Sequence, residues 1–383
     1  MDYEKIFAGA KQEKLSGRYL CNTHIEPILE SLSTAGHVSV LGHSVLGKNI
    51  FGFRIGQGET KILAWSQMHG NESTCTKALF DFFNFLSAES ELQRKILSEY
   101  TFQFIPILNP DGAEAYTRVN ANGVDLNRDA QDLSQPESIV LRRVYDSFQP
   151  QYCFNMHDQR TIFGVAETGK PATVSFLAPS FNTEREYNDV RINAMQVINR
   201  MNTTLQQFIP GQVGRFDDGF NINCVGDTFQ FLGTPTILFE AGHYPGDYAR
   251  EMTRRYIFFA LLSACEPVHE NVIVNNEIEQ YLNIPQNNPN LFDFVYKNIK
   301  INYESSEIIT NFAAQYKEEL VGKTVKFNAF VVKMGDLTDC FGHSEIDGEG
   351  AKYSDGAENI PLPDQPADFF LDNREYHNGS LKS

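Results

Sequence analysis

The sequence predicts an α/β protein, in which a mixed, mostly parallel central sheet carries helices on both faces and a small C-terminal α+β or β-rich module follows. Three observations support this prediction. The chain has 383 residues, which is too long for one small domain and suits one large domain with an added module. Strand-like and helix-like segments alternate up to about residue 265. After about Pro267 the character changes, and Asn and Pro punctuate the chain.

The strands of the first part are indicated by short apolar runs between turn residues. Residues 37–55 form a predicted hairpin that turns near Gly47, and a second turn follows at 56–58. Further strands are expected at 61–66, 100–108, 152–155 and 236–239. The strand at 100–108 leads into an Asn-Pro-Asp-Gly turn. The last strand is apolar throughout, as is typical of strands that are buried on both faces.

Helices are expected in the intervals between these strands. A helix that begins at Ser73 or Thr74 and reaches Phe85 is indicated by apolar residues at helical spacing. Three more are expected at 136–148, 190–208 and 247–265. Because strands and helices alternate, the strands should run mostly parallel, with helices covering both faces of the sheet.

The residues after Pro267 are expected to form a separate module. A strand-like segment at 292–303 precedes a helix-like segment at 304–320, and residues 325–333 alternate as a half-buried strand would. We therefore expect a large domain at 1–267 and a small C-terminal domain of unknown role at 268–383.

Composition and charge limit the partners and the location. Asp and Glu number 49 against 32 Lys and Arg, so the net charge is −17. An acidic surface repels phosphates and anionic lipid, so neither nucleic acid nor a membrane is an expected partner. The first residues are charged, no apolar run approaches the roughly 18 residues of a membrane span, and the six cysteines are scattered. We expect a cytoplasmic protein with reduced thiols, and the oligomeric state stays open.

Candidate metal ligands follow the predicted strands. His69 and Glu72 stand three residues apart in a Met-His-Gly-Asn-Glu stretch, and His157 and Glu240 each follow another strand. Singly, such residues are more often structural than catalytic. Open α/β sheets, however, bind ligands beyond the carboxyl ends of their strands. Two imidazoles and one carboxylate suit a catalytic zinc, which takes three protein ligands and leaves one position for water.

Two further motifs make the series resemble a known family. Asn-Pro-Asp-Gly at 109–112 is followed by Arg118 and then by Gly-Val-Asp-Leu-Asn-Arg at 123–128. In this order the motifs resemble those of the funnelin-type zinc carboxypeptidases, which are carboxypeptidase A/B-like metallopeptidases. The resemblance covers roughly residues 20–265 and implies a zinc carboxypeptidase-like fold for that part of the chain.

The resemblance implies that His69, Glu72 and His157 bind one Zn²⁺ per chain. Asp125 would be the carboxylate that orients His69. This agrees with the rule that a ligating imidazole usually donates its other N–H to a carboxylate or a carbonyl group.

Four further residues are implied to act on the substrate. Glu240 matches the general base, and a carboxylate at the end of a buried strand is costly unless it has a partner or a task. Arg118 would polarise the scissile carbonyl group and stabilise the oxyanion. Asn127 and Arg128 would bind the terminal carboxylate of the substrate, for which a planar guanidinium is well suited.

The chain also departs from the family pattern. Asp129 stands where many members have asparagine, and its charge could favour a substrate amino group or simply cap a turn. Digestive members place a tyrosine some twenty residues before the base, where this chain has none. Arg215 is the candidate substitute in that region.

The leading interpretation is a hydrolase: a zinc metallocarboxypeptidase that cleaves the C-terminal amide bond of peptides, with peptidoglycan-type peptides left open as substrates. The first alternative is an N-acyl amino acid amidohydrolase of the succinylglutamate desuccinylase or aspartoacylase type. The second is a non-catalytic module that binds peptide termini, although such modules usually lose a ligand or the base. In the first two cases the substrate is a peptide or a small amide with a free carboxylate.

Overall fold

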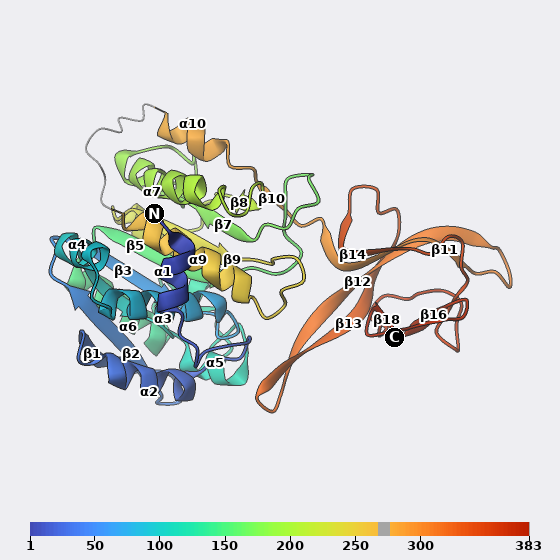
Figure 1. Ribbon diagram of the computed structural model, residues 1–383, viewed down its shortest axis with the longest axis horizontal. Helices are drawn as coiled ribbons and strands as arrows, with labels where there is room; N and C mark the ends of the chain where they lie inside the picture. Colours follow the sequence, from blue (N-terminus) through green and yellow to red (C-terminus); the bar gives the residue numbers. More distant parts are fainter. Residues whose placement is uncertain (267–275, 383) are drawn as a thin grey trace. The chain divides into compact units, whose positions relative to one another are not determined.

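A computed structural model describes residues 1–266 and 276–382 (Figure 1). The chain forms two compact units. The first unit comprises Met1–Gln159 and Ala172–Asn287, and the second comprises Arg160–Pro171 and Asn288–Ser383. The expected boundary between residues 267 and 268 lies outside the described residues. The boundary between the two units lies at Asn287 and Asn288, further along the chain than expected. The second unit also includes Arg160–Pro171 from the middle of the sequence.

The first unit is built on an eight-stranded sheet in the order β1-β2-β4-β3-β5-β9-β7-β8. Strands β4, β3, β5 and β9 pair in parallel, as do β7 and β8, whereas β1–β2, β2–β4 and β7–β9 are antiparallel. This is the expected mixed, mostly parallel sheet. The strands are β1 (His37–His43), β2 (Asn49–Gly56), β3 (Thr60–Ser66), β4 (Tyr100–Ile105), β5 (Tyr152–Asp158), β7 (Val174–Leu177), β8 (Val213–Arg215) and β9 (Thr236–Ala241).

Helices cover both faces of this sheet. One face packs in a single apolar cluster with α1 (Tyr3–Ala10), α2 (Asn22–Leu32), α3 (Thr74–Ser87), α4 (Glu91–Glu99), α7 (Asp189–Leu205) and α9 (Glu251–Ala264). The other face packs with α6 (Pro136–Phe148) and α8 (Val225–Phe231). Full burial of a side chain such as Phe83 contributes on the order of 2–3 kcal/mol. The short helix α10 (Glu277–Leu282) completes the unit, and no described helix combines the length and the apolar character of a membrane span.

The expected Asn-Pro-Asp-Gly turn is the start of a short helix, α5 (Pro110–Ala115). Asn109 caps it, because its side chain accepts a hydrogen bond from the backbone N–H of Gly112, and proline is favoured at the first helical position. Gly70 lies against this helix so closely that a Cβ atom there would come within 1.9 Å of the Gly112 backbone. The two motifs are therefore in contact, and glycine is required where they meet.

The second unit is β-rich. Its larger sheet has the order β13-β12-β11-β14, and its smaller sheet has the order β15-β16-β17-β18. Side chains of both sheets, among them Tyr296, Phe312 and Phe369, form one apolar core. The strands are β6 (Gly164–Val165), β10 (Asn287–Asn288), β11 (Leu291–Ile301), β12 (Ile308–Val321), β13 (Thr324–Gly335), β14 (Phe341–Asp347), β15 (Tyr353–Ser354), β16 (Phe369–Leu371), β17 (Arg374–His377) and β18 (Ser380–Leu381).

The helix that we expected at 304–320 is wrong, because this segment is strand β12. Good helix formers such as Ala313, Ala314 and Glu319 suggested a helix. In the structure β12 pairs with β11 on one side and with β13 on the other. Phe312 and Ala314 enter the core between the two sheets, whereas Ala313 lies in a separate apolar cluster. The packing of alternate β12 residues into two apolar clusters thus outweighs the helix propensity of this segment.

Candidate metal centre

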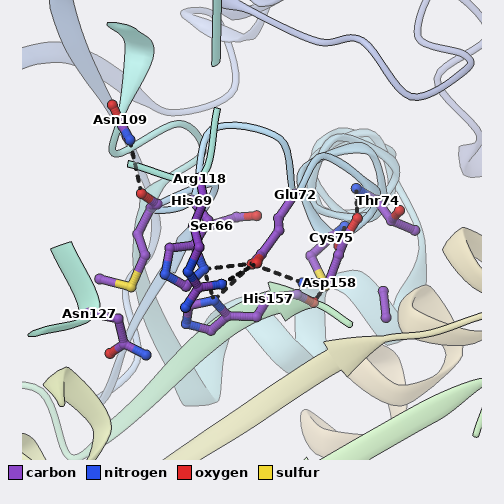
Figure 2. Close-up of polar contacts among 12 residues, drawn as sticks. Ser66, His69, Glu72, Thr74, Cys75, Asn109, Arg118, Asn127, His157 and Asp158 are labelled. Carbon is purple, nitrogen blue, oxygen red and sulfur yellow. Dashed lines mark hydrogen bonds and ion pairs between the residues drawn. The ribbon is translucent and has the colours of Figure 1, made fainter. Parts of the chain in front are cut away.

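The candidate ligands meet at one edge of the central sheet, where β3, β5 and β9 end. His69 and Glu72 lie in the loop between β3 and α3, and His157 is near the end of β5. Glu240 on β9 is paired in parallel register with His157. Residues in register on neighbouring strands project from the same face. The parallel topology therefore brings residues that are far apart in sequence into one place (Figure 2).

The three side chains converge on a common point. His69 Nδ1 lies 2.8 Å from one oxygen of Glu72, and His157 Nδ1 lies 2.9 Å from the other. The two Nδ1 atoms are 3.1 Å apart. All three residues are buried, and in the part of the chain that the structure describes they are the only His, Cys, Asp and Glu group able to hold a metal ion.

These donors fit a zinc ion. Zinc binds imidazole nitrogen and carboxylate oxygen at about 2.0–2.2 Å, so tetrahedral ligand atoms are separated by about 3.3 Å. The separation of the two Nδ1 atoms, 3.1 Å, is close to this value. A third donor from Glu72 leaves the fourth position for water, as in catalytic zinc sites. The cluster is therefore compatible with a zinc site.

Asp125 and Arg118 flank the cluster. Asp125 accepts a hydrogen bond from Nε2 of His69 over 3.0 Å, which leaves Nδ1 of His69 facing Glu72. The other oxygen of Asp125 accepts from Nε of Arg118 over 3.1 Å, and Arg118 Nη1 lies 3.3 Å from Glu72. Asp125 thus holds both the imidazole ring and the guanidinium group.

Electrostatics explains how the buried groups coexist. Burial raises the pKa of Glu72, but the facing imidazoles of His69 and His157 outweigh burial and hold that pKa well below its usual range. Burial likewise lowers the pKa of His69, but Glu72 and Asp125 outweigh it and raise that pKa. The result is a charged cluster whose members depend on one another.

Glu240 lies in the opposite environment. Its Oε2 atom is buried and has no hydrogen-bond partner in the described part of the chain. Burial, together with the negative charges of Glu72 and Asp158, raises its pKa well above the usual value. A divalent cation between the ligands would counteract this effect and favour the ionised form. Glu240 is therefore a carboxylate whose proton affinity depends on its neighbours, as catalytic acid–base groups require.

The comparison with known proteins agrees with this geometry. Residues 22–159 match a family model described as zinc carboxypeptidase. Residues 22–159 thus correspond to part of a zinc carboxypeptidase domain. The match supports a hydrolase of the metallocarboxypeptidase class, and members of this family use zinc. The matched segment contains the three candidate ligands but not Glu240, whose place beside them follows from its strand register with His157. No curated protein sequence matches the chain.

Solved metallocarboxypeptidases have the same fold. The enzyme from Burkholderia cenocepacia is 16% identical, with a TM-score of 0.50 over 63% of this chain and 68% of that one. The enzyme from Pseudomonas aeruginosa, solved with (2-guanidinoethylmercapto)succinic acid, is 17% identical, with a TM-score of 0.51 over 64% and 68%. Carboxypeptidase A from Helicoverpa armigera is 14% identical, with a TM-score of 0.51 over 74% and 79%. At these identities the likeness concerns the fold.

Asn127 and Arg128 follow Asp125 in the zinc carboxypeptidase domain, in a short 3-10 helix (Leu126–Arg128). The Asn127 side-chain oxygen accepts a hydrogen bond from the backbone N–H of Val225, which fixes the residue against the start of α8. Arg128 is exposed, and its Nη1 donates to the Asn127 carbonyl over 2.7 Å. Within the described part of the chain, neither side chain hydrogen-bonds to His69, Glu72 or His157, and Arg128 offers an accessible guanidinium.

Both departures from the family pattern have structural roles. Asp129 is buried, and its carboxylate accepts hydrogen bonds from the backbone N–H groups of Ser134 and Gln135, which closes the loop that follows Arg128. Asp129 therefore caps a turn, which is one of the two roles considered for it from the sequence. The guanidinium of Arg215 lies over the Tyr281 ring at 5.4 Å, and its Nε donates to a backbone carbonyl. Arg215 is thus engaged in packing.

The sequence analysis missed two charged residues next to the site. Asp158 directly follows His157, and its position at the end of a buried strand was a usable signal. Arg250 is also buried, with 2% of its surface exposed. It lies in the segment that we expected to be the first turn of the 247–265 helix. In fact α9 begins at Glu251, and Arg250 precedes it in a left-handed conformation with φ of 59°.

Proposed function

We propose that this protein is a zinc-dependent carboxypeptidase that hydrolyses the C-terminal amide bond of peptides. One observation carries the proposal. The buried cluster of His69, Glu72 and His157 lies beside Glu240, a carboxylate that shares strand register with His157 and has an oxygen without a hydrogen-bond partner. Three ligands and an adjacent free base are the components of metal-assisted hydrolysis.

Each residue has a distinct task in this proposal. Zinc, when bound by the three ligands, would lower the pKa of a water molecule and polarise the scissile carbonyl group. Glu240 accepts the proton of the attacking water and then delivers it to the leaving nitrogen. Asp125 keeps Nδ1 of His69 directed at the metal position by accepting from Nε2.

Arg118 is suited to stabilise the negative charge that develops on the carbonyl oxygen. Its side chain is 49% exposed and yet reaches Glu72 and Asp125 at the edge of the cluster. It therefore lies between solvent, from which the substrate arrives, and the reacting centre. A fixed cation beside a developing oxyanion typically lowers the activation free energy by about 3 kcal/mol.

Asn127 and Arg128 are proposed to bind the terminal carboxylate. The exposed guanidinium of Arg128 offers paired donors that match a carboxylate, and Asn127 is held in place by α8. The structural neighbour from Pseudomonas aeruginosa was solved with a succinic acid derivative, which supports a carboxylate-binding function for this fold. The substrates would be peptides with a free C-terminus, with peptidoglycan-type peptides as a subclass to be tested.

The deciding experiment separates metal binding from chemistry. The wild-type protein should contain about one zinc per chain, and His69→Ala or His157→Ala should lose it. Glu240→Gln should retain zinc and lose at least about 10²-fold in turnover, because it can no longer accept a proton. Near-normal turnover of Glu240→Gln would rule out the proposed base.

A substrate panel tests the reaction class. Peptides, peptidoglycan fragments and N-acyl amino acids should be compared at equal concentration. Release of C-terminal residues from peptides is expected. Cleavage of N-acyl amino acids alone would instead identify the amidohydrolase, and zinc binding with no turnover on any of them would identify a binding module.

A further inference from the structure

A buried network lies behind the cluster and connects the three chain segments that carry its functional residues. The first segment is the loop of His69 and Glu72, which leads into α3. The second is the end of β5 after His157, and the third is the end of β9 after Glu240. These segments meet at the edge of the sheet, and side chains that touch all three would control their spacing.

Asp158 connects the first two segments. Its carboxylate accepts hydrogen bonds from the backbone N–H groups of Thr74, over 2.9 Å, and Cys75, over 3.2 Å, at the start of α3 (Figure 2). Its own backbone N–H donates to the Glu72 carboxylate over 3.1 Å. The thiol of Cys75 in turn donates to the His157 carbonyl. The end of β5 is thereby bonded both to a metal-ligand side chain and to the helix that follows it.

Arg250 connects the second and third segments. Its Nη1 donates to the carbonyl of Ala241, which directly follows Glu240, and its Nη2 donates to the carbonyl of Gln159, each over 2.6 Å. Its Nη1 also lies 3.8 Å from the Asp158 carboxylate. A single planar guanidinium therefore spans the ends of both strands. A short ammonium group could not make these contacts together.

We propose that Asp158 and Arg250 act together as positioning residues that set the spacing of the zinc ligands and of Glu240. This inference rests on the proposed function of the cluster. Neither side chain touches the reacting atoms. The Asp158 carboxylate acts through the backbone of Thr74 and Cys75, which follow Glu72. Arg250 acts through the carbonyls of Gln159 and Ala241, which follow His157 and Glu240. Groups that orient metal ligands typically change metal affinity or activity by 10- to 100-fold when they are altered.

A matched control lies in α9, the helix that Arg250 precedes. Arg254 is fully buried, lies one turn along α9 from Arg250, and bonds the Asp81 carboxylate and the Leu15 carbonyl. It resembles Arg250 in burial and in bonding, but its partners lie in the N-terminal segment, in α3 and, at Glu251, in α9 itself. Loss of Arg254 should reduce stability without changing the metal geometry, whereas loss of Arg250 should change both.

The experiment uses cobalt as a spectroscopic probe of the cluster. Co²⁺ is exchanged into the full chain of the wild type, Arg250→Gln, Arg250→Lys, Asp158→Asn and Arg254→Gln, and the visible absorption spectrum is recorded. Zinc affinity is measured by competition with a chelator, and kcat and KM are measured with the preferred peptide. Where Arg250→Gln does not fold, the two conservative variants Arg250→Lys and Asp158→Asn serve for the same comparison.

The expected result is a changed cobalt spectrum, a roughly 10- to 100-fold loss of zinc affinity and a lower kcat at near-constant KM in the Arg250 and Asp158 variants. Arg254→Gln should keep the wild-type spectrum and zinc affinity although it melts at a lower temperature. If the Arg250 and Asp158 variants matched Arg254→Gln in spectrum and affinity, the inference would be wrong while the proposed function stood. A wild-type protein that bound neither metal would overturn the proposed function itself.

Discussion

Two glutamates at the same sheet edge, Glu72 buried and Glu240 half-buried, have opposite electrostatic surroundings. Glu72 faces two imidazoles, which hold its pKa low in spite of burial, whereas desolvation of the Glu240 carboxylate, together with the charges of Glu72 and Asp158, raises its pKa. The first is therefore suited to hold a cation permanently, and the second is suited to exchange a proton. The two side chains are chemically identical, so their different suitability for these two roles comes from their surroundings.

The preference for a free terminal carboxylate should depend on Arg128. The wild type is expected to prefer free over amidated C-termini, because an amide lacks the charge that a guanidinium recognises. In Arg128→Gln this preference should fall by roughly 10- to 100-fold, the value of a charge-assisted hydrogen bond. The measurement is the ratio of kcat/KM for matched peptides. Arg142→Gln, which changes a surface residue paired with Asp146, is the control, and equal ratios in both variants would exclude the role.

Asp227 should make stability depend on pH. It is 7% exposed, and burial raises its pKa from 3.8 to about 7. Between these values the folded state binds a proton that the unfolded state does not, so this group's contribution to stability falls as pH rises from about 4 to 7. The variant Asp227→Asn stays neutral. It should match the wild type near pH 4 and exceed it at pH 8 by at most about 4 kcal/mol.

Urea unfolding of the metal-free wild type and of the Asp227 variant at several pH values measures this difference. Metal-free protein is used because zinc binding has a pH dependence of its own. A stability difference that did not vary with pH would contradict the raised pKa.

At the scale of elements, the loop after the 3-10 helix depends on Asp129. Asp129→Ala would leave the N–H groups of Ser134 and Gln135 without their acceptor, at a cost of about 1–3 kcal/mol for the buried Gln135 and less for the exposed Ser134. We expect a lower melting temperature and an unchanged ranking of substrates. Asp132→Ala, at an exposed position in the same loop, is the matched control. If the order of substrate preference changed in Asp129→Ala but not in Asp132→Ala, the charge of Asp129 would contribute to substrate selection.

The sheet and the convergence of the candidate ligands were predictable because their signals are local. Each ligand follows an apolar strand, and the parallel arrangement predicted from strand–helix alternation places all strand ends at one edge. The residues that could not be predicted depend on distant partners. Arg250 binds the carbonyl of Gln159, just after β5, and that of Ala241 at the end of β9, and no residue near Arg250 in the sequence indicates this. The segment of β12 has helix-forming residues and becomes a strand only because two neighbouring strands pair with it.

At the scale of the whole molecule, the second unit is not a simple C-terminal appendage. It includes residues 160–171, which begin three positions after His157. Thr161 accepts a hydrogen bond at its carbonyl from His343 over 2.8 Å, and its side chain bonds that of Gln315 over 2.7 Å. Leu291 donates to the carbonyl of Ile162 over 3.1 Å. The chain that leaves β5, the strand of the candidate ligand His157, is thus folded into the β-rich unit.

Removal of the C-terminal residues should therefore unfold the 160–171 segment. In a chain that ends at Asn287, the hydrogen bonds from Leu291, Gln315 and His343 are lost, and the backbone of this segment loses its partners. Unpartnered segments are preferred sites of proteolysis, because cleavage requires local unfolding. Limited proteolysis with mass spectrometry should show cleavage between 160 and 171 in the truncated chain and protection in the full chain. The exposed loop at 183–187 serves as the internal reference for protease activity in both samples. Identical cleavage patterns and melting temperatures would mean that the segment is ordered by the first unit alone. Cleavage that was accompanied by loss of zinc would show in addition that the order of this segment is transmitted to His157.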